Sequence, residues 1–220
     1  PLAGVRVTVI NPGPTAPYSG MLPGFVAGHY GRDDLDIDLV QLARFAGARV
    51  INGKAIAIDR AAREIMVQGR PPIAYDIASL DVGITSEMPK LSGFAEHGIP
   101  AKPLGAFAAR WDAFRETTDD PSVAVIGGGV AGAELAMGMA HALRARGHDP
   151  KVTLIDRSRI LDGFGETARR LLIDALTAQG VALIENTGVE CVMADGAVLS
   201  DGRTIAAAFV TGAAGARPHD

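Results

Sequence analysis

Apolar residues along the chain fall into short continuous or alternating runs, and between these runs they recur every three or four positions. The first pattern predicts β-strands and the second predicts amphipathic helices, so the chain is expected to be an α/β protein. The predicted strands are Val5–Ile10, Arg49–Ile58, Glu64–Gln68, Ile77–Val82, Val123–Ile126, Lys151–Asp156, Val181–Ile184, Val189–Met193, Ala197–Leu199, Thr204–Ala207 and Phe209–Gly212. The predicted helices are Asp38–Phe45, Leu104–Arg115, Val130–Arg146 and Gly165–Gln179.

Turn-forming residues separate these elements. Asn11–Tyr30 is rich in Pro and Gly around an apolar centre, and Leu91–Pro103 is expected to be a loop. Arg49–Ile58 and Glu64–Gln68 are expected to pair as antiparallel strands. The linker Thr117–Pro121 is the best candidate for a domain boundary.

One stretch combines a strand, a glycine turn and a helix. Val123–Ile126 suits a fully buried parallel strand, and it leads into the spacing Gly127-x-Gly129-x-x-Gly132. In a dinucleotide-binding turn the first glycine permits the tight bend, the second lets a pyrophosphate approach the backbone, and the third allows close helix packing. The pyrophosphate would then lie at the helix N-terminus, where free amides and the macrodipole favour negative charge.

The next predicted strand, Lys151–Asp156, ends in a carboxylate. An acid at this place accepts hydrogen bonds from the adenosine ribose hydroxyls. Asp156 lies slightly farther beyond Gly132 than is usual, and the additional loop Gly147–Pro150 accounts for the difference. A glycine-rich turn in an α/β protein without a ligand is the alternative, but the order of strand, turn, helix and acid favours a nucleotide site.

Composition narrows the classes of protein that remain. Of the 220 residues 48% are hydrophobic and 21% charged, which is typical of a globular protein, and the net charge of -4 gives no reason to expect nucleic acid. No apolar stretch approaches the length of about 18 residues that a membrane span needs. A single cysteine, Cys191, excludes an intramolecular disulfide and suits a reducing cytoplasm.

The two halves of the sequence echo each other loosely. In both, a parallel strand leads to a helix, then an antiparallel excursion, then a strand that ends at glycine, in Leu80–Gly83 and in Phe209–Gly212. Two nucleotide-binding domains of one plan would produce this pattern. The alternative is that any α/β chain yields such segments.

Four segments carry a resemblance to a known family. They are the VIGGGVAGAELA run at Val125–Ala136, the strand-plus-glycine pair at Leu80–Gly83 and Val210–Ala213, and the Pro-rich Ala16–Gly24. On these the chain resembles the pyridine-nucleotide:disulfide oxidoreductase superfamily, specifically its type II NADH dehydrogenase-like branch. With Gly98–Pro103, it is most similar to members found next to, or fused with, selenophosphate synthetase.

The resemblance implies an α/β fold of two Rossmann-like domains that bind FAD and NAD(P), each with a small antiparallel excursion. Residues 1–116 would form a partial FAD-binding domain and residues 117–220 an NAD(H)-binding domain. The chain is expected to start at the second strand of the FAD domain, without the first glycine fingerprint, and to stop before the family's flavin-contacting Gly-Asp pair. The sequence is therefore expected to be an excerpt.

The resemblance also implies site residues. Glu134 would lie near the nicotinamide and the flavin ring as the catalytic carboxylate, although an acid favourable to the helix dipole is an equal alternative. Asp156 would favour NADH over NADPH, while Arg157 and Arg159 could soften that preference. The expected cofactor-binding residues are Gly127, Gly128, Gly129, Gly132, Asp156, Gly212 and Gly83.

The implied function is FAD-dependent NAD(P)H oxidation, with hydride passing from NADH to flavin and electrons then to a quinone or another small acceptor. Where the disulfide reductases carry a cysteine pair, this chain has Tyr18, Ser19 and Met21, so an internal dithiol is excluded. The alternative is a non-catalytic dinucleotide-binding module or fragment. A flavin-independent dehydrogenase is disfavoured because the Tyr-x3-Lys pair of short-chain enzymes is absent.

The other candidate residues give weaker evidence for a functional role. Tyr18, Met21 and Leu22 suit a flavin or acceptor pocket as well as an apolar loop, and Lys102 is expected to be solvated. The five histidines are expected to be isolated, and Cys191 to be buried on a strand. A cytoplasmic location is expected; association with selenophosphate synthetase, a homodimer and peripheral membrane contact stay open.

Overall fold

The structure is a computed structural model that describes residues 4–86 and 88–217. The chain divides into two compact units. The first comprises Pro1–Ser19 with Arg32–Val82, and the second comprises Gly20–Gly31 with Gly83–Asp220. The boundary expected after residue 116 separates cofactor domains rather than compact units, and it stays a prediction.

The first unit contains a parallel strand pair connected through a helix. β1 (Thr8–Asn11) pairs with β4 (Arg49–Asn52), and α2 (Leu39–Ala46) precedes β4. Asp38 caps α2, because its carboxylate accepts hydrogen bonds from the backbone N–H groups two and three residues ahead, both at 2.9 Å. Gly47 ends the helix in the left-handed conformation.

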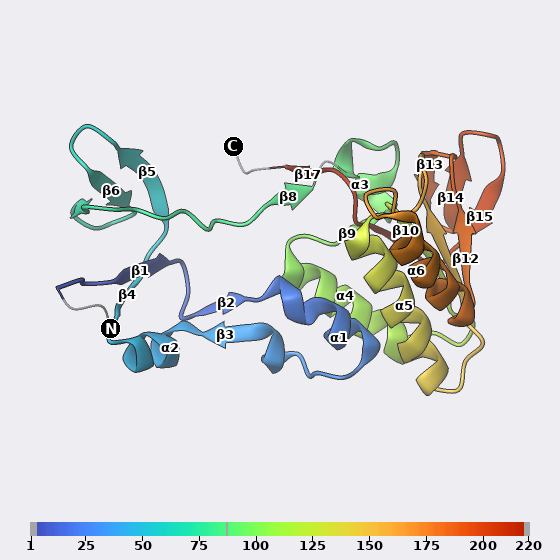
Figure 1. The fold of residues 1–220 in the computed structure, drawn as a ribbon, viewed down its shortest axis with the longest axis horizontal. Helices are drawn as coiled ribbons and strands as arrows, with labels where there is room; N and C mark the ends of the chain where they lie inside the picture. The colour runs from blue at the N-terminus through green and yellow to red at the C-terminus, as the bar shows by residue number, and fades with distance from the viewer. Residues whose placement is uncertain (1–3, 87, 218–220) are drawn as a thin grey trace. The chain divides into compact units, whose positions relative to one another are not determined.

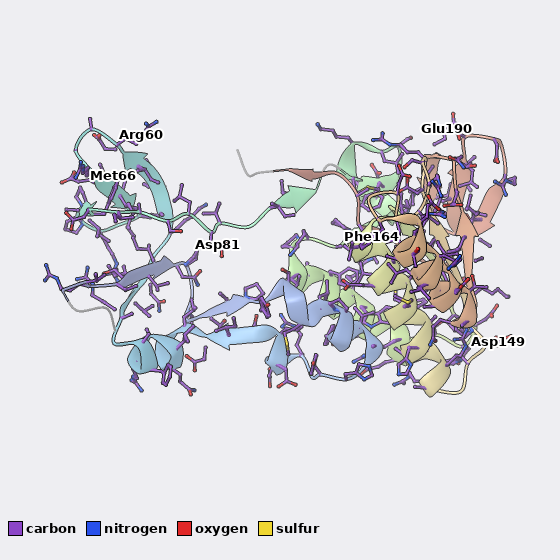
Figure 2. All side chains as sticks on the ribbon, in the orientation of Figure 1. Arg60, Met66, Asp81, Asp149, Phe164 and Glu190 are labelled. Atoms are coloured by element: carbon purple, nitrogen blue, oxygen red, sulfur yellow. The ribbon has the colours of Figure 1, made fainter. Side chains whose placement is uncertain are left out.

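Short antiparallel strands complete the first unit. β2 (Thr15–Pro17) pairs with β3 (Asp36–Asp38), which follows the 3₁₀ turn η2 (Asp33–Leu35). A meander is formed by β5 (Ala55–Asp59), β6 (Glu64–Val67) and β7 (Ile73–Ala74). Figure 2 labels Arg60 in the turn of this hairpin and Met66 on β6.

Two predictions for the first unit were wrong in part or in whole. The expected strand Arg49–Ile58 breaks at Gly53, so its first part pairs in parallel with β1 and only its second part is antiparallel. The expected buried strand Ile77–Val82 is irregular and exposed, with Ile77 at 92% and Val82 at 69% exposure. An apolar run becomes a strand only where neighbouring strands take its backbone hydrogen bonds, and no strand pairs with this one in the described part of the chain.

The second unit is built on a five-stranded parallel sheet with the order β12-β11-β10-β16-β9. Figure 1 labels β9, β10 and β12 of this sheet. The strands are β9 (Ile99–Pro100), β10 (Ser122–Ile126), β11 (Lys151–Ile155), β12 (Val181–Ile184) and β16 (Phe209–Gly212). The helices are α4 (Leu104–Thr117), α5 (Val130–Ala145) and α6 (Glu166–Ala178). Apart from β9, these elements confirm the sequence predictions to within two residues.

Both faces of this sheet are covered, as its apolar strands require. On one face, Trp111 of α4 packs edge-to-face against Phe209 of β16, with ring centroids 5.6 Å apart. On the other face, Ala124 and Ile126 share a core with Leu199 of a three-stranded antiparallel sheet. That sheet consists of β13 (Val189–Met193), β14 (Gly196–Leu199) and β15 (Thr204–Ala206), and its strands too were predicted.

A short helix that the sequence did not predict packs against α5. α1 (Leu22–Ala27) follows the 3₁₀ turn η1 (Ser19–Met21) inside the Pro- and Gly-rich segment. It approaches α5 so closely that a methyl group added at Gly138 would lie 3.2 Å from the carbonyl oxygen of Pro23. Trp111 Nε1 donates to the carbonyl of Val26 at 3.1 Å, which ties α4 to the same helix.

The expected loop Leu91–Pro103 also contains structure. α3 (Phe94–His97) and β9 lie within it, and η3 (Met88–Lys90) precedes it. β8 (Thr85–Ser86) pairs with β17 (Ala216–Arg217) in an antiparallel ribbon. Strands of two residues and helices of a single turn are too short to show a periodic pattern, which is why the sequence did not reveal them. Within residues 4–86 and 88–217, none of the helices has the length and apolar character that a bilayer span requires.

Replacing Trp111 with phenylalanine should destabilise the second unit. The variant W111F leaves the buried carbonyl of Val26 without its indole donor, at a cost of about 1–3 kcal/mol in unfolding free energy. Urea denaturation would measure this difference. The control L171A removes a side chain that is 63% exposed on α6 and should change the unfolding free energy by less than about 0.5 kcal/mol. Equal stability of W111F and the unsubstituted protein would contradict the assigned packing.

Candidate functional site

Chemically distinctive residues gather at the carboxyl edge of the parallel sheet. Gly127 follows β10, Asp156 follows β11, Glu185 follows β12, and Gly212 ends β16. Because the four strands are parallel and their last residues are aligned with one another, their carboxyl ends meet at one edge. This edge is where open α/β sheets bind ligands.

Three of the four glycines in and after the turn that follows β10 are required by the structure, and the fourth faces open space. Gly127 has a φ of 111°, a conformation that residues with a side chain rarely adopt. A methyl group at Gly132 would lie 1.8 Å from the carbonyl oxygen of Gly127, so α5 could not pack this closely on the turn. A methyl group at Gly128 would lie 2.7 Å from Ile160. At Gly129, by contrast, it would meet nothing within 4 Å, so the backbone there faces open space.

The N-terminus of α5 is open to an anion. Gly129 is the N-cap residue, no side chain caps the helix, and its first turn contains no acidic residue. The first amides of a helix have no partner within the helix, and together with the macrodipole they attract negative charge. The open space beside Gly129 therefore adjoins a set of donors suited to a pyrophosphate.

Asp156 is bound to the glycine turn. Its Oδ2 accepts a hydrogen bond from the Gly128 amide at 2.5 Å, and its Oδ1 accepts from the amide and the hydroxyl of Ser158, both at 2.7 Å. Partial burial raises the pKa of Asp156, but these hydrogen bonds and the charge of Arg157 outweigh it, so the pKa lies below the ordinary 3.8. The carboxylate is therefore ionised at neutral pH and retains lone pairs for further donors.

A second loop, residues 157–165, supports the turn. The Leu161 amide donates to the carbonyl of Gly128 at 2.8 Å, and Ile160, which is fully buried, packs under Gly128. Glu185 accepts from the Ile160 amide at 2.7 Å and pairs with Arg169. None of these residues was predicted as part of the site; the position of Glu185 directly after a strand of the sheet was a signal for it in the sequence.

Glu134 lies on the exposed face of α5 and lines a groove of about 330 Å³ between α1 and α5. His29 and His141 line the same groove, with ring centroids 5.3 Å apart. The prediction that the histidines are isolated was therefore wrong for this pair. It failed because α1, which places His29 beside α5, was not predicted. Among the described residues, no group of three or more His, Cys, Asp or Glu could hold a metal ion.

The remaining candidate residues lie outside the glycine turn. A methyl group at Gly212 would lie 2.5 Å from the side chain of Met88, so this glycine is needed for packing. Gly83 has a φ of 74° and is exposed. Lys102, expected to be solvated, is half-buried after β9, and burial lowers its pKa. Cys191 lies on β13 as predicted but is half-buried rather than buried.

The parallel sheet, the glycine turn, the open helix N-terminus and the acid after the next strand are together typical of a Rossmann-like fold, the class to which dinucleotide-binding domains belong. The protein-family model "Pyridine nucleotide-disulphide oxidoreductase" matches residues 2–220. The chain therefore belongs to the pyridine nucleotide-disulphide oxidoreductase family.

Two curated relatives agree with this assignment. An NADH dehydrogenase-like protein of Mycobacterium tuberculosis is 30% identical over 184 residues, which cover 78% of this chain and 46% of the relative. The NADH dehydrogenase-like protein YutJ of Bacillus subtilis is 24% identical over 220 residues, covering 98% of this chain and 59% of the relative. The chain thus spans about half the length of the curated relatives it matches.

Solved structures share the fold. NDH2 from Plasmodium falciparum in complex with NADH has a TM-score of 0.82 at 14% identity, covering 97% of this chain and 51% of that one. The NAD-dependent persulfide reductase from A. fulgidus has a TM-score of 0.80 at 22% identity, covering 99% of this chain and 42% of that one. At these identities the likeness supports the mixed α/β fold of FAD- and NAD-binding oxidoreductases.

Alanine at two glycines of the turn should lower the stability to very different extents. G132A drives a methyl group into the Gly127 carbonyl and should lower the unfolding free energy by about 1–3 kcal/mol. G129A adds the same methyl group in open space, at a residue with a φ of -73°, so it loses only the preference for glycine over alanine at an N-cap and should cost less than G132A. Denaturant titration of both variants would measure the contrast. Equal destabilisation would contradict the geometry of the turn.

The stabilising effect of Asp156 should depend on pH. Because its folded pKa lies below the unfolded value of 3.8, its contribution is complete above that value and is lost as the pH falls through the folded pKa. D156N should therefore be less stable than the unsubstituted protein at neutral pH, and the difference should shrink at about pH 3. Urea denaturation across this range would test it. A constant difference at every pH would be inconsistent with the prediction, and D149N on an exposed loop controls for the loss of charge.

Proposed function

We propose that the chain is the nucleotide-binding part of an FAD-dependent NADH oxidoreductase of the NADH dehydrogenase-like kind. The reaction would be the transfer of a hydride from NADH to FAD, which would supply the electrons for a quinone or another small acceptor. The observation that carries this proposal is the pairing of an open glycine turn at the N-terminus of α5 with the ionised Asp156 one strand away. This arrangement suits both a pyrophosphate and a ribose.

The carboxylate of Asp156 supports NADH rather than NADPH. It accepts from ribose hydroxyls, whereas a 2′-phosphate would bring a second negative charge beside it. Arg159, which could attract that phosphate, pairs with Glu166 at 3.0 Å and lies 3.8 Å from Asp162. Arg157 remains as a basic neighbour that softens the preference for NADH.

The relatives support this choice of cofactor and reaction. Both curated relatives are described as NADH dehydrogenase-like, and the P. falciparum NDH2 structure contains NADH. This chain has a single cysteine, so it contains no redox-active cysteine pair. A quinone or a small oxidant therefore suits the proposal better than transfer through an internal dithiol.

The use of FAD is inferred from membership of the family alone. In the described residues of the first unit, neither β1 nor β4 is followed by a glycine turn and a helix N-terminus of the kind that follows β10. These residues therefore do not supply a comparable pyrophosphate cradle, and no residue-level step is assigned to the flavin. When bound, FAD would accept the hydride of NADH.

Glu134 is the proposed catalytic residue. It lies on α5 five residues beyond the N-cap Gly129 and lines the open groove with Gly24 and His29. A carboxylate here would orient the nicotinamide carboxamide or hold a proton beside it. Gly212 and Gly83 are retained as proposed cofactor contacts, on the NAD and FAD sides respectively.

The wider proposals follow the family resemblance. Residues 1–116 would belong to an FAD-binding domain and residues 117–220 to an NAD(H)-binding domain. A cytoplasmic location and association with selenophosphate synthetase stay predictions, and homodimer formation stays open. The alternative function is a dinucleotide-binding module without turnover, which would bind NADH but transfer no electrons.

The flavin spectrum of the whole protein during titration with NADH would test the function. Bleaching of the flavin bands is expected with the unsubstituted protein. D156A removes a charge-assisted hydrogen bond to ribose, so the KM for NADH should rise roughly tenfold or more, with less effect on NADPH.

The control D149A makes the same charge change at the other end of β11 and should leave both KM values unchanged. A protein that binds NADH without bleaching would favour the non-catalytic module. A protein whose affinity for NADH is unaffected in D156A would contradict the assigned site.

A further inference from the structure

The peptide groups of the glycine turn are held on both sides. The Gly128 amide donates to Asp156 at 2.5 Å, and the Gly128 carbonyl accepts from Leu161 at 2.8 Å. A peptide group is planar and trans, so its N–H points opposite to its C=O. The bond from Leu161 therefore also sets the direction of the Gly129 N–H, the amide beside the open space at the start of α5.

Leu161 makes this bond while it holds an uncommon backbone conformation. Its φ is 58°, in the left-handed region where a leucine is strained. Ile160 and Leu161 are 0% and 3% exposed, so both are packed tightly beneath the turn. Other contacts must hold the loop in this conformation.

Arg169 and Glu185 hold it from two neighbouring elements. Glu185, after β12, accepts from the Ile160 amide at 2.7 Å, and Arg169, on α6, donates through Nε to the Ile160 carbonyl at 2.8 Å. The two side chains also form an ion pair with each other. The side chain of Arg169 is 14% exposed and that of Glu185 is 32% exposed, so water competes little for the hydrogen bonds of the arginine. Both backbone groups of one buried residue are thus fixed by one side-chain pair.

We propose that Glu185 and Arg169 are positioning residues for the dinucleotide. Through Ile160 and Leu161 they hold the Gly128 carbonyl, and thereby direct the Gly129 amide toward the pyrophosphate. Neither side chain contacts the cofactor. The inference rests on the proposed function, because it assigns the Gly129 amide to a bound dinucleotide.

The test compares E185A with E185Q in the whole protein. E185A removes the acceptor for the Ile160 amide and should weaken the binding of both NADH and ADP-ribose about tenfold. E185Q keeps an oxygen at the same place and should bind within about threefold of the unsubstituted protein. ADP-ribose contains the pyrophosphate but no nicotinamide, so its affinity, measured by calorimetry, reports on the turn rather than on hydride transfer.

Amide hydrogen exchange supplies a readout that needs no ligand. The Leu161 amide should exchange faster in E185A and keep its protection in E185Q. The control E190A, on the exposed side of β13 (Figure 2), should change neither exchange nor affinity.

Each further outcome decides one question. The inference is overturned if the E185A protein is less stable but binds ADP-ribose with normal affinity. It is also overturned if the E185Q protein binds ADP-ribose as weakly as the E185A protein. An unsubstituted protein that binds neither NADH nor ADP-ribose overturns the proposed function, and with it the role assigned to the Gly129 amide. Normal binding by E185A, with the unsubstituted protein binding well, overturns the inference alone.

Discussion

The hydrogen bond from the Gly128 amide to the Asp156 carboxylate is the interaction on which the candidate site depends. It joins the ends of two neighbouring parallel strands, β10 and β11. It also uses the amide of a residue at which any side chain would collide with Ile160. The same carboxylate keeps the loop after β11 in place through Ser158. One partly buried hydrogen bond at the edge of the sheet therefore connects the turn, the acid and the supporting loop.

Close backbone packing is the second requirement of this site. The turn can approach α5 only because Gly132 leaves room for the Gly127 carbonyl, and Gly138 eases the close approach of α1 to α5 beside Pro23. Two glycines of one helix thus serve contacts with two different segments. The groove that contains Glu134, His29 and His141 is a result of the second contact.

Sequence reasoning predicted the β10–α5–β11 unit because its signals are local. A continuous apolar run, glycines at fixed spacing and an acid after the next strand all lie within one stretch of chain. It failed at Ile77–Val82, where the residues are apolar but no strand pairs with them, since strand formation depends on distant partners. It also missed Leu161 and Glu185, because a positive φ and a hydrogen bond across elements are set by tertiary packing. The groove histidines were missed for the same reason.

The edge strand β9 has a consequence for how the chain reaches its native state. Its partner is β16, and Thr211 Oγ1 donates to the Ile99 carbonyl across a separation of 112 residues. Synthesis proceeds at about 5–20 residues per second, so roughly ten seconds pass between the emergence of the two strands. During that interval β9 has no partner strand, while β10, α5 and β11 can already assemble. Contacts of such long range are slow to form, so the insertion of β16 between β10 and β9 is expected to be a late event in folding.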